Sequence, residues 1–359
     1  MIMKILVIVK WMVRWNGTSR VVYELSKRFK REHEVRIVAY KDYLDPKWEK
    51  EIKINKLQHK GLFTLKEIRE IIKEYKPDII HSHDWLGLLA LFSGAPHVST
   101  THGTWPMNWF FSPTYFIGGT MQEIPHEFEM HLADKVISVS KYQQEKLRKR
   151  GIESEVIYNG VDEEFLNPPK NQIEYEHPSI LFVGSLDDNK AKYLAPFIKL
   201  LNRKSKKKVH TYVIGAPVDR RIVKSLRNLE NTHYLGVIDD VKPYYYGVDV
   251  LLSTSRLEAC PLVPIEAQAC GMPVVAFDVY SHAEIIKNGK SGFLVDLGNL
   301  DRMADKTLKI LTDEDLRNEM GRNGIENVKV NFHWSDKAEE YIKLFKSLLA
   351  DVAPCAQIF

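Results

Sequence analysis

Residues 4–39 read KILVIVKWMVRWNGTSRVVYELSKRFKREHEVRIVA, and this stretch decides the fold. A β-rich apolar run, Lys4–Val9, leads through Asn16-Gly17 into a helical stretch, Ser19–Lys30, and then into a second apolar run, Glu34–Ala39. A strand, a helix and a strand within ~30 residues have the size of one βαβ unit. The beginning of the chain therefore predicts a parallel sheet.

The second half of the chain begins in the same way. Ser179–Val183 leads through Gly184 into a helical stretch, Tyr193–Asn202, and then into Val209–Ile214. Further strands are expected at Asp78–His81, Val98–Thr101, Lys135–Val139, Glu155–Tyr158, Thr232–Leu235, Val248–Ser253, Pro273–Ala276 and Gly292–Val295. Strands that alternate with helices indicate α/β architecture, and 359 residues suit two domains of ordinary size. We therefore expect two doubly wound, Rossmann-like domains.

The boundary between the domains is expected in Glu163–Pro178, which is mostly polar and contains Pro168, Pro169 and Pro178. This gives an N-terminal domain over residues 1–165 and a C-terminal domain over residues 166–334. Residues 335–359 are expected to form a C-terminal helix and tail. Because Ala338, Tyr341 and Phe345 share one apolar face of that helix, we expect it to pack back toward the N-terminal domain.

The composition describes a globular protein with ample core material, 44% hydrophobic and 27% charged. Lys and Arg (51) nearly balance Asp and Glu (47), so no nucleic-acid partner is expected. Three cysteines without metal-ligand spacing fit a reducing compartment, and no apolar run reaches membrane-spanning length. We expect a cytoplasmic protein. The basic runs Lys146–Arg150 and Lys204–Lys208 are interpreted as solvated faces, with peripheral contact at the inner face of a membrane as the alternative.

Polar residues and glycines follow the predicted strands, where ligands bind in open α/β sheets. Gly17 follows the first strand, His83-Asp84 follows the third, and His102-Gly103 follows Val98–Thr101; Gly184 has the equivalent place in the second half. Two facing domains with ligand groups at these edges imply an interdomain cleft.

The most specific candidate for a functional site in the sequence is the segment Glu258-Ala-Cys-Pro-Leu-Val-Pro-Ile-Glu266. Pro261 and Pro264 suit a loop or a first helical turn, so Glu258 is expected on a loop and Glu266 inside the following helix. The backbone N–H groups between the two glutamates would then form a helix N-terminus suited to a diphosphate.

These residues resemble the E-x7-E signature of retaining glycosyltransferase family four, which has the GT-B fold. The resemblance extends along most of the chain, in order and at suitable spacing. Its other segments are Asn16-Gly17, Ile80-His-Ser-His-Asp-Trp85, Thr101-His-Gly103, Ile157-Tyr-Asn-Gly-Val-Asp162, Phe182-Val-Gly-Ser-Leu186 with Lys190, and Gly289-Lys-Ser-Gly-Phe-Leu-Val295.

The resemblance implies roles for individual residues in binding a nucleotide-sugar donor. Glu266 would bind the ribose hydroxyls, Glu258 would contact the sugar, and Lys190 would neutralise the departing diphosphate. His102 would reach the transferred sugar from the N-terminal domain. The implied donor-binding set is Gly17, Gly184, Ser185, Lys190, Leu262, Val263 and Glu266, and the implied catalytic set is His102, Lys190 and Glu258.

The sequence departs from the family pattern at three places in the C-terminal domain. The loop after Glu258 reads Ala-Cys-Pro instead of the usual Gly-Phe-Gly. Ser185 stands where the family usually carries arginine, so a bidentate phosphate contact is lost. Ser281-His282 replaces the usual glycine pair. No second carboxylate resembles the nucleophile of a retaining glycosidase, so we expect same-face attack assisted by the leaving phosphate. Without a convincing D-x-D or His/carboxylate cluster, neither a metal nor another cofactor is expected.

Other functions are weighed against this interpretation. A nicotinamide dehydrogenase would need G-x-G-x-x-G in the first turn, which is missing. A sugar-nucleotide epimerase of the same fold and a catalytically idle sugar-nucleotide binder remain alternatives. His81 and His83 could in principle ligate a metal, but no third ligand has suitable spacing. Asp84 is better interpreted as a helix N-cap.

The acceptor is expected to bind the aromatic segment that follows His102. It contains Trp105, Trp109 and Phe110 among other rings and is broken by two prolines. Aromatic faces suit sugar rings or lipid chains, so a sugar or lipid-linked acceptor is predicted here. The alternative is that these rings pack into the core of the N-terminal domain.

Overall fold

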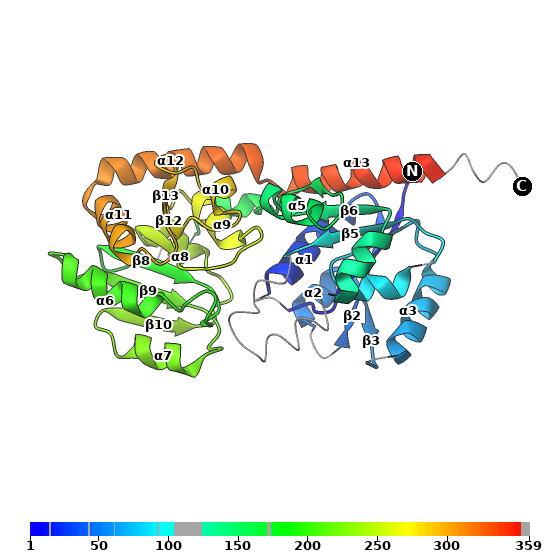
Figure 1. Cartoon of the computed structure of the whole chain (residues 1–359), viewed down its shortest axis with the longest axis horizontal. Coiled ribbons are helices and arrows are strands. Elements are labelled where there is room, and N and C mark those ends of the chain that lie inside the picture. Colours follow the sequence, from blue (N-terminus) through cyan, green and yellow to red (C-terminus); the bar gives the residue numbers. More distant parts are fainter. Residues whose placement is uncertain are drawn as a thin grey trace, which may run out of the picture. The chain divides into compact units, whose positions relative to one another are not determined.

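A computed structural model of the chain describes residues 1–13, 16–41, 44–60, 62–91, 93–103, 124–170 and 174–352 (Figure 1). Two compact units share the chain: Met1–Asn159 with Trp334–Phe359, and Gly160–His333. Each unit contains one parallel sheet with helices on both faces. The expectation of two Rossmann-like α/β domains is confirmed.

The first unit has a seven-stranded sheet in the order β3-β2-β1-β4-β5-β6-β7, and every strand pair is parallel. Its elements are β1 (Lys4–Ile8), α1 (Gly17–Phe29), β2 (Glu34–Tyr40), α2 (Pro46–Glu51), β3 (Lys53–Leu57), α3 (Leu62–Tyr75), β4 (Ile79–Ser82), the 3-10 helix η2 (Trp85–Ala90), β5 (His97–Thr101), β6 (Lys135–Ser138), α5 (Lys141–Arg148), β7 (Glu155–Val156) and α13 (Trp334–Val352). Residues 124–132 are also helical.

The second unit has a six-stranded parallel sheet in the order β10-β9-β8-β11-β12-β13. Its elements are η4 (Glu163–Leu166), β8 (Ser179–Val183), α6 (Leu194–Lys204), β9 (His210–Ile214), α7 (Arg220–Arg227), β10 (Thr232–Gly236), α8 (Lys242–Gly247), β11 (Val250–Ser253), α9 (Leu262–Ala269), β12 (Val274–Phe277), α10 (His282–Ile285), β13 (Gly292–Val295), α11 (Leu300–Thr312) and α12 (Glu314–Asn331).

Both sheets reverse their strand order at one point, between β1 and β4 in the first unit and between β8 and β11 in the second. At such a switch point the connections leave toward opposite faces of the sheet, which opens a crevice outside the carboxyl ends of the two strands. The fold therefore places the loops after β1, β4, β8 and β11 where ligands bind in this architecture.

All twelve strands expected from the sequence are present within a few residues of their predicted bounds, and β3 is an addition. Its sequence, KINKL, has only two apolar residues, which are separated by asparagine and lysine, and the strand lies at the edge of the sheet. Only Leu57 of this strand is buried, so its composition carries no apolar run.

The helices cover each sheet on both faces. In the first unit α1 packs against α13, and α3 packs beside η2 over the other face. Phe29 of α1 contacts Phe345 of α13 with ring centroids 5.6 Å apart, and the same Phe345 packs against His81 of β4. In the second unit α6 packs with α11, and α9 packs with α12. The apolar face predicted for the C-terminal helix thus covers the sheet of the first unit.

The units divide after Asn159, earlier than the expected boundary after residue 165. The intervening residues are fixed within the second unit. The Val161 N–H donates to the carbonyl of Phe332 at 2.8 Å, and the carbonyl of Phe165 accepts from the Tyr246 hydroxyl at 2.9 Å. These contacts attach residues 160–166 to the second unit, which could not be predicted from their linker-like composition.

Candidate functional site

Hydrogen bonds hold together the loops that follow β8 and β11 in the second unit. The Arg256 N–H donates to the carbonyl of Asn189 at 3.0 Å, and the Asn189 side chain donates to the carbonyl of Leu257 at 3.1 Å. The Thr254 hydroxyl donates to the carbonyl of Lys190 at 2.6 Å. The two loops at the switch point therefore form one bonded structure that carries Lys190 and Glu258.

Lys190 and Glu258 form an ion pair, with 3.2 Å between Nζ and Oε1. The Lys190 side chain is 34% exposed and that of Glu258 is 15% exposed, so both groups remain accessible. The negative charge of Glu258 is the main reason why the pKa of Lys190 is raised, against the opposing effect of burial. The ammonium is therefore charged throughout the physiological range and can face an anion.

Ser185 faces the turn that carries Lys190. Its hydroxyl donates to Oδ2 of Asp187, and Oδ1 of Asp187 accepts the backbone N–H of Lys190 at 2.9 Å. Asp187 thus fixes the start of the segment that bears Lys190. Nearby, the buried guanidinium of Arg256 is paired with Asp188, so this loop structure contains a second cation.

Gly184 and Gly215 approach each other closely at the ends of β8 and β9. A Cβ on Gly215 would lie 1.7 Å from the carbonyl oxygen of Gly184. A Cβ on Gly184 would lie 3.3 Å from Cδ of Lys190, within the tight range of contacts. The absence of side chains here lets the turn after β8 pack against β9 and leaves room for Lys190.

Glu266 lies within α9, which begins directly after Pro261, and Glu258 lies on the preceding loop as the prolines predict. The side chain of Glu266 is buried, and its Oε2 accepts the hydroxyl of Tyr245 at 2.9 Å. Leu262 and Val263 are the first two residues of α9, where backbone N–H groups lack intrahelical partners. Tyr245, which orients Glu266, was not identified from the sequence because it lies in α8, outside every motif.

His282 lies beside Glu258, in place of the family's glycine. The Ser281 hydroxyl donates to the carbonyl of Glu258 at 3.2 Å, which fixes the loop against the glutamate. The His282 ring is fully buried, and neither ring nitrogen has a hydrogen-bond partner of good geometry within the described part of the chain. Burial lowers the pKa of His282, although Glu258 acts in the opposite direction. The ring is therefore neutral.

In the first unit, Gly17 begins α1 immediately after Asn16, whose side chain caps the helix by accepting the Ser19 N–H at 3.0 Å. Apart from its chain neighbours and the backbone of its own helix, no atom of the described residues lies within 4 Å of the position that a Cβ on Gly17 would occupy. Asp84 joins the ends of β1 and β4, because its carboxylate accepts the Lys10 N–H at 2.5 Å and the Leu86 N–H at 3.0 Å. Asp84 is thus the N-cap of η2, as expected.

His81, His83 and His102 form a group of close imidazoles. His83 Nδ1 lies 2.8 Å from Nε2 of His102, and His81 Nε2 lies 2.8 Å from the hydroxyl of Thr100. Burial is the main reason why the pKa values of His81 and His102 are lowered to about 3. His102 is therefore neutral near pH 7 and can donate or accept a hydrogen bond, but it carries no charge.

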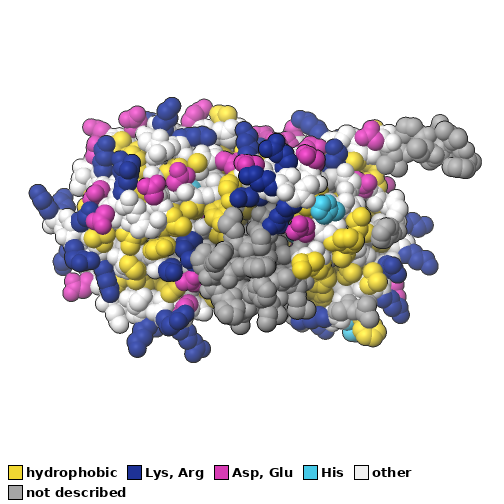
Figure 2. All heavy atoms as spheres, in the orientation of Figure 1, with side chains coloured by type: hydrophobic (Ala, Val, Ile, Leu, Met, Phe, Trp, Pro, Cys, Tyr) yellow, Lys and Arg dark blue, Asp and Glu magenta, His cyan; other side chains and the backbone are white. Residues whose placement is uncertain are grey.

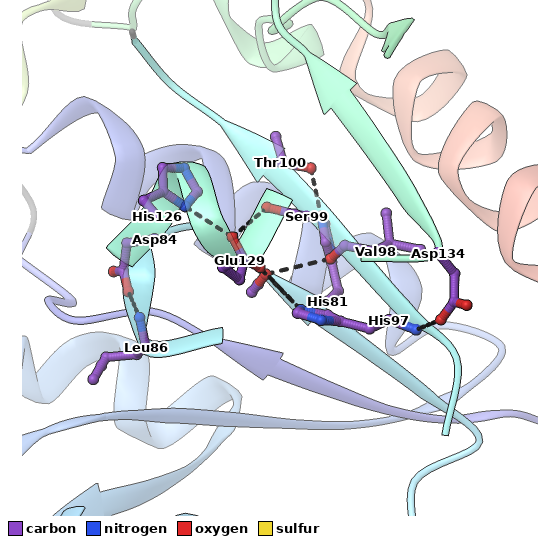
Figure 3. Close-up of polar contacts among 11 residues, drawn as sticks. His81, Asp84, Leu86, His97, Val98, Ser99, Thr100, His126, Glu129 and Asp134 are labelled. Carbon is purple, nitrogen blue, oxygen red and sulfur yellow. Dashed lines mark hydrogen bonds and ion pairs between the residues drawn. The ribbon is translucent and has the colours of Figure 1, made fainter. Parts of the chain in front are cut away.

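Figure 3 shows a second polar cluster of the first unit, in which His97, Ser99 and His126 surround the buried carboxylate of Glu129. Oε1 of Glu129 accepts the Ser82 hydroxyl at 2.5 Å, and Oε2 accepts the Ser99 hydroxyl at 2.8 Å; His97 and His126 lie 3.1 and 2.8 Å away. Burial raises the pKa of Glu129, but the two histidines outweigh it and lower the pKa to about 2. This cluster was not predicted from the sequence. The three-residue spacing of His126 and Glu129, which puts both on one helical face, was the available signal.

Several other expectations concern the surface and the termini. Trp105, Trp109 and Phe110 lie outside the described residues. Cys260 and Cys270 are buried, and Cys355 is also outside the described residues. None of the described helices has the length and apolar character needed to cross a bilayer. Lys and Arg lie among Asp and Glu over the face shown in Figure 2, and Lys204 is paired with Asp301 and Asp305.

A surface pocket of about 430 Å³ lies in the first unit, lined by residues 130–131, 133–136 and 151–155. It is at the amino end of β6, because Lys135 begins that strand. Switch-point ligands bind at the opposite, carboxyl edge, so this pocket is separate from the candidate site.

Family models match both halves of the chain. The model described as "Glycosyl transferases group 1" matches residues 163–327, and the model described as "Glycosyltransferase Family 4" matches residues 15–165. An uncharacterized glycosyltransferase of Methanocaldococcus jannaschii is 29% identical over 92% of this chain and 95% of its own length. Alpha-maltose-1-phosphate synthase of Mycolicibacterium smegmatis is 24% identical over 76% of this chain and 79% of its own.

Solved structures share the fold over almost the whole chain. Sucrose-phosphate synthase from Thermosynechococcus elongatus superposes with a TM-score of 0.84 at 21% identity, covering 97% of this chain and all of the other. The Anabaena protein HepE, solved in complex with UDP-glucose, superposes with a TM-score of 0.80 at 17% identity, covering 96% of this chain and all of the other. At these identities the likeness concerns the fold alone.

Proposed function

Since the chain belongs to glycosyltransferase family 4, with the GT-B fold, we propose that it transfers a sugar, with retention of anomeric configuration, from a nucleotide-sugar donor to a glycan or lipid-linked acceptor. The C-terminal domain binds the donor in this proposal. The observation that carries it is the accessible Lys190–Glu258 ion pair at the β8/β11 switch point, held beside the first turn of α9.

The chemistry of the leaving group explains why this arrangement suits the reaction. The glycosidic bond to the nucleoside diphosphate breaks as negative charge grows on the diphosphate. A charged ammonium and the N–H groups of Leu262 and Val263 are fixed donors for that charge, and fixed donors need no reorganisation as it develops. Glu258, once Lys190 turns to the diphosphate, is available to accept hydroxyls of the transferred sugar. Glu266, oriented by Tyr245, accepts the ribose hydroxyls.

Two features of the mechanism are part of the proposal. The departing phosphate oxygen accepts the proton of the acceptor hydroxyl on the same face, which requires no protein nucleophile. The positive charge that assists departure comes from Lys190 and α9, so turnover needs no divalent metal. His102, neutral as its lowered pKa indicates, acts through a hydrogen bond to the transferred sugar.

Release of nucleoside diphosphate from UDP-, GDP- and ADP-sugars, with and without acceptors, tests the function. UDP-glucose is the first donor to try, because HepE was solved with it. We expect acceptor-stimulated release that persists in EDTA and is lost in Lys190→Ala. Interconversion of the sugar without acceptor would indicate an epimerase, and donor binding without either reaction an idle binder. Loss of turnover in EDTA, restored by Mg²⁺, would overturn metal independence.

The acceptor is proposed to bind the aromatic segment after His102, which the sequence alone supports. The double variant Trp109→Ala with Phe110→Ala should lose transfer to the acceptor and keep slow hydrolysis of the donor. This pattern is expected because only acceptor contacts would be removed. Circular dichroism shows whether the variant folds. Equal loss of both reactions, or a variant that unfolds, would assign these rings to the core.

A further inference from the structure

Three side chains of the second unit converge at the amino ends of its strands, the opposite edge from the proposed donor site. His210 begins β9, His233 is the second residue of β10, and Glu176 precedes β8. His233 is paired in register with Tyr212, which lies two residues after His210 on the same face of the sheet. The register of β9 and β10, which lie side by side in Figure 1, therefore predicts that both imidazoles project from one face of the sheet.

The potential ligand atoms surround one point. His210 Nδ1 is 3.0 Å from Oε2 of Glu176 and 3.3 Å from Nε2 of His233, and that Nε2 is 3.9 Å from the same carboxylate oxygen. Ligands at ~2.0–2.1 Å in a tetrahedral zinc site lie about 3.3–3.4 Å apart. The three separations therefore bracket the value for a shared metal ion.

Hydrogen bonds between these three side chains account for their convergence less well than a bound cation does. A proton on His210 Nδ1 can be directed to Glu176 or to Nε2 of His233, and the remaining lone pairs still face each other. A proton on His233 Nε2 instead leaves Nδ1 of His210 and the carboxylate oxygen, 3.0 Å apart, without a proton between them. A divalent ion accepts all three lone pairs at once.

A shell of aromatic residues holds the ligands in place. Tyr212 stacks on His233 with centroids 4.9 Å apart, and its hydroxyl accepts the backbone N–H of Glu176 at 3.1 Å. Tyr175 packs edge-on against Tyr212 at 5.2 Å. One residue thus orients a ligand from β10 and a ligand from the segment entering β8. Outer contacts of this kind are typical of metal sites.

We propose that Glu176, His210 and His233 bind a divalent transition-metal ion, for which Zn²⁺ is the best match, with water as the fourth ligand. The Glu176 and His233 side chains are 67% and 37% exposed, so the ion and the water can enter from solvent. The ion would link the segment before β8 to the edge strand β10. Its role is structural and independent of sugar transfer, because the site lies at the strand ends opposite Lys190 and Glu258.

Calorimetric titration of the metal-stripped full-length protein with Zn²⁺, paired with melting temperatures, tests the site. We expect one Zn²⁺ per chain and a rise in melting temperature with Zn²⁺ but not with Mg²⁺, which prefers oxygen ligands. His210→Ala, His233→Ala and Glu176→Gln should each weaken Zn²⁺ binding at least about tenfold. His59→Ala is the matched control, because His59 forms an exposed histidine–glutamate pair with Glu67 elsewhere.

Equal Zn²⁺ affinity in the wild-type protein and in all three variants would overturn the proposal. If a variant unfolds, Co²⁺ decides the question on the wild-type protein alone. Intense tetrahedral Co²⁺ absorption supports the site, and the weak spectrum of hydrated Co²⁺ overturns it. Sugar-transfer activity in His233→Ala should equal that of the wild type, so the result does not depend on the proposed function.

Discussion

Ser185 distinguishes this chain from the family pattern at the scale of single residues. Its hydroxyl is bonded to Asp187, which also caps the Lys190 segment, so the position points toward the turn around the proposed diphosphate site. An arginine there would add a forked cation beside Lys190. The native serine leaves Lys190 as the cation that the resemblance assigns to the phosphates.

Ser185→Arg should tighten binding of the nucleoside diphosphate product, by about tenfold for an added charge-assisted bond of ~1.4 kcal/mol. Product-inhibition constants measure the change. Ser185→Ala is the control, because it removes the bond to Asp187 without adding charge. If inhibition by the product is the same in all three proteins, position 185 does not face the phosphates.

For single residues, the sequence predicts the local backbone but not the side-chain partners. Glu258 on a loop and Glu266 in a helix could be predicted, because prolines constrain the backbone locally. The partners of these groups could not. Tyr245 reaches Glu266 from a different helix, and Glu129 meets His97 and Ser82 only after β4 and β5 pair. Such contacts depend on register and side-chain direction, which no local pattern encodes.

At the scale of elements, the α/β architecture could be predicted because buried parallel strands appear in the sequence as continuous apolar runs. The edge strand β3 was missed for the same reason, since an edge strand needs no such run. The turns after β8 and β9 depend on the close approach of Gly215 to the Gly184 carbonyl. The glycines in the sequence suggest turns here, but the distance between the two turns can be known only from the structure.

Gly215→Ala should destabilise the protein by about 1–3 kcal/mol, because the new Cβ would overlap that carbonyl and force the turn after β8 to move. Chemical denaturation measures the loss. Gly17→Ala is the matched control: it begins a helix and its Cβ would meet open space, so stability should be unchanged or slightly higher. Equal stability of Gly215→Ala and the wild type would show that the turns after β8 and β9 can move apart without loss of stability.

At the scale of the whole molecule, the two units differ in their buried histidines. His81, His83 and His102 of the first unit all have lowered pKa values, mainly through burial. The unfolded chain therefore binds more protons than the folded unit from about pH 3 to about pH 6.5, and stability falls as the pH is lowered through this window. His282 has a lowered pKa in the second unit.

We therefore expect the first unit to unfold first as the pH falls below about 6.5. The sequence of the second unit contains no tryptophan, so tryptophan fluorescence reports on the first unit. Far-UV circular dichroism reports on both units. The tryptophan transition should come at a higher pH than the remaining loss of circular dichroism. Coincident transitions, or a tryptophan signal that is constant down to pH 3, would contradict this account.

In the proposed function, the second unit binds a nucleoside diphosphate through Glu266, Lys190 and the start of α9. Calorimetric titration of the full-length protein with the diphosphate of its donor tests it most directly, by comparing the wild type with Glu266→Gln. We predict that the substitution weakens binding by roughly 1.5–3 kcal/mol, the value of a charge-assisted hydrogen bond. Glu326→Gln, at an exposed position of α12, should leave the affinity unchanged. Equal affinity of Glu266→Gln and the wild type would show that Glu266 does not bind the nucleotide.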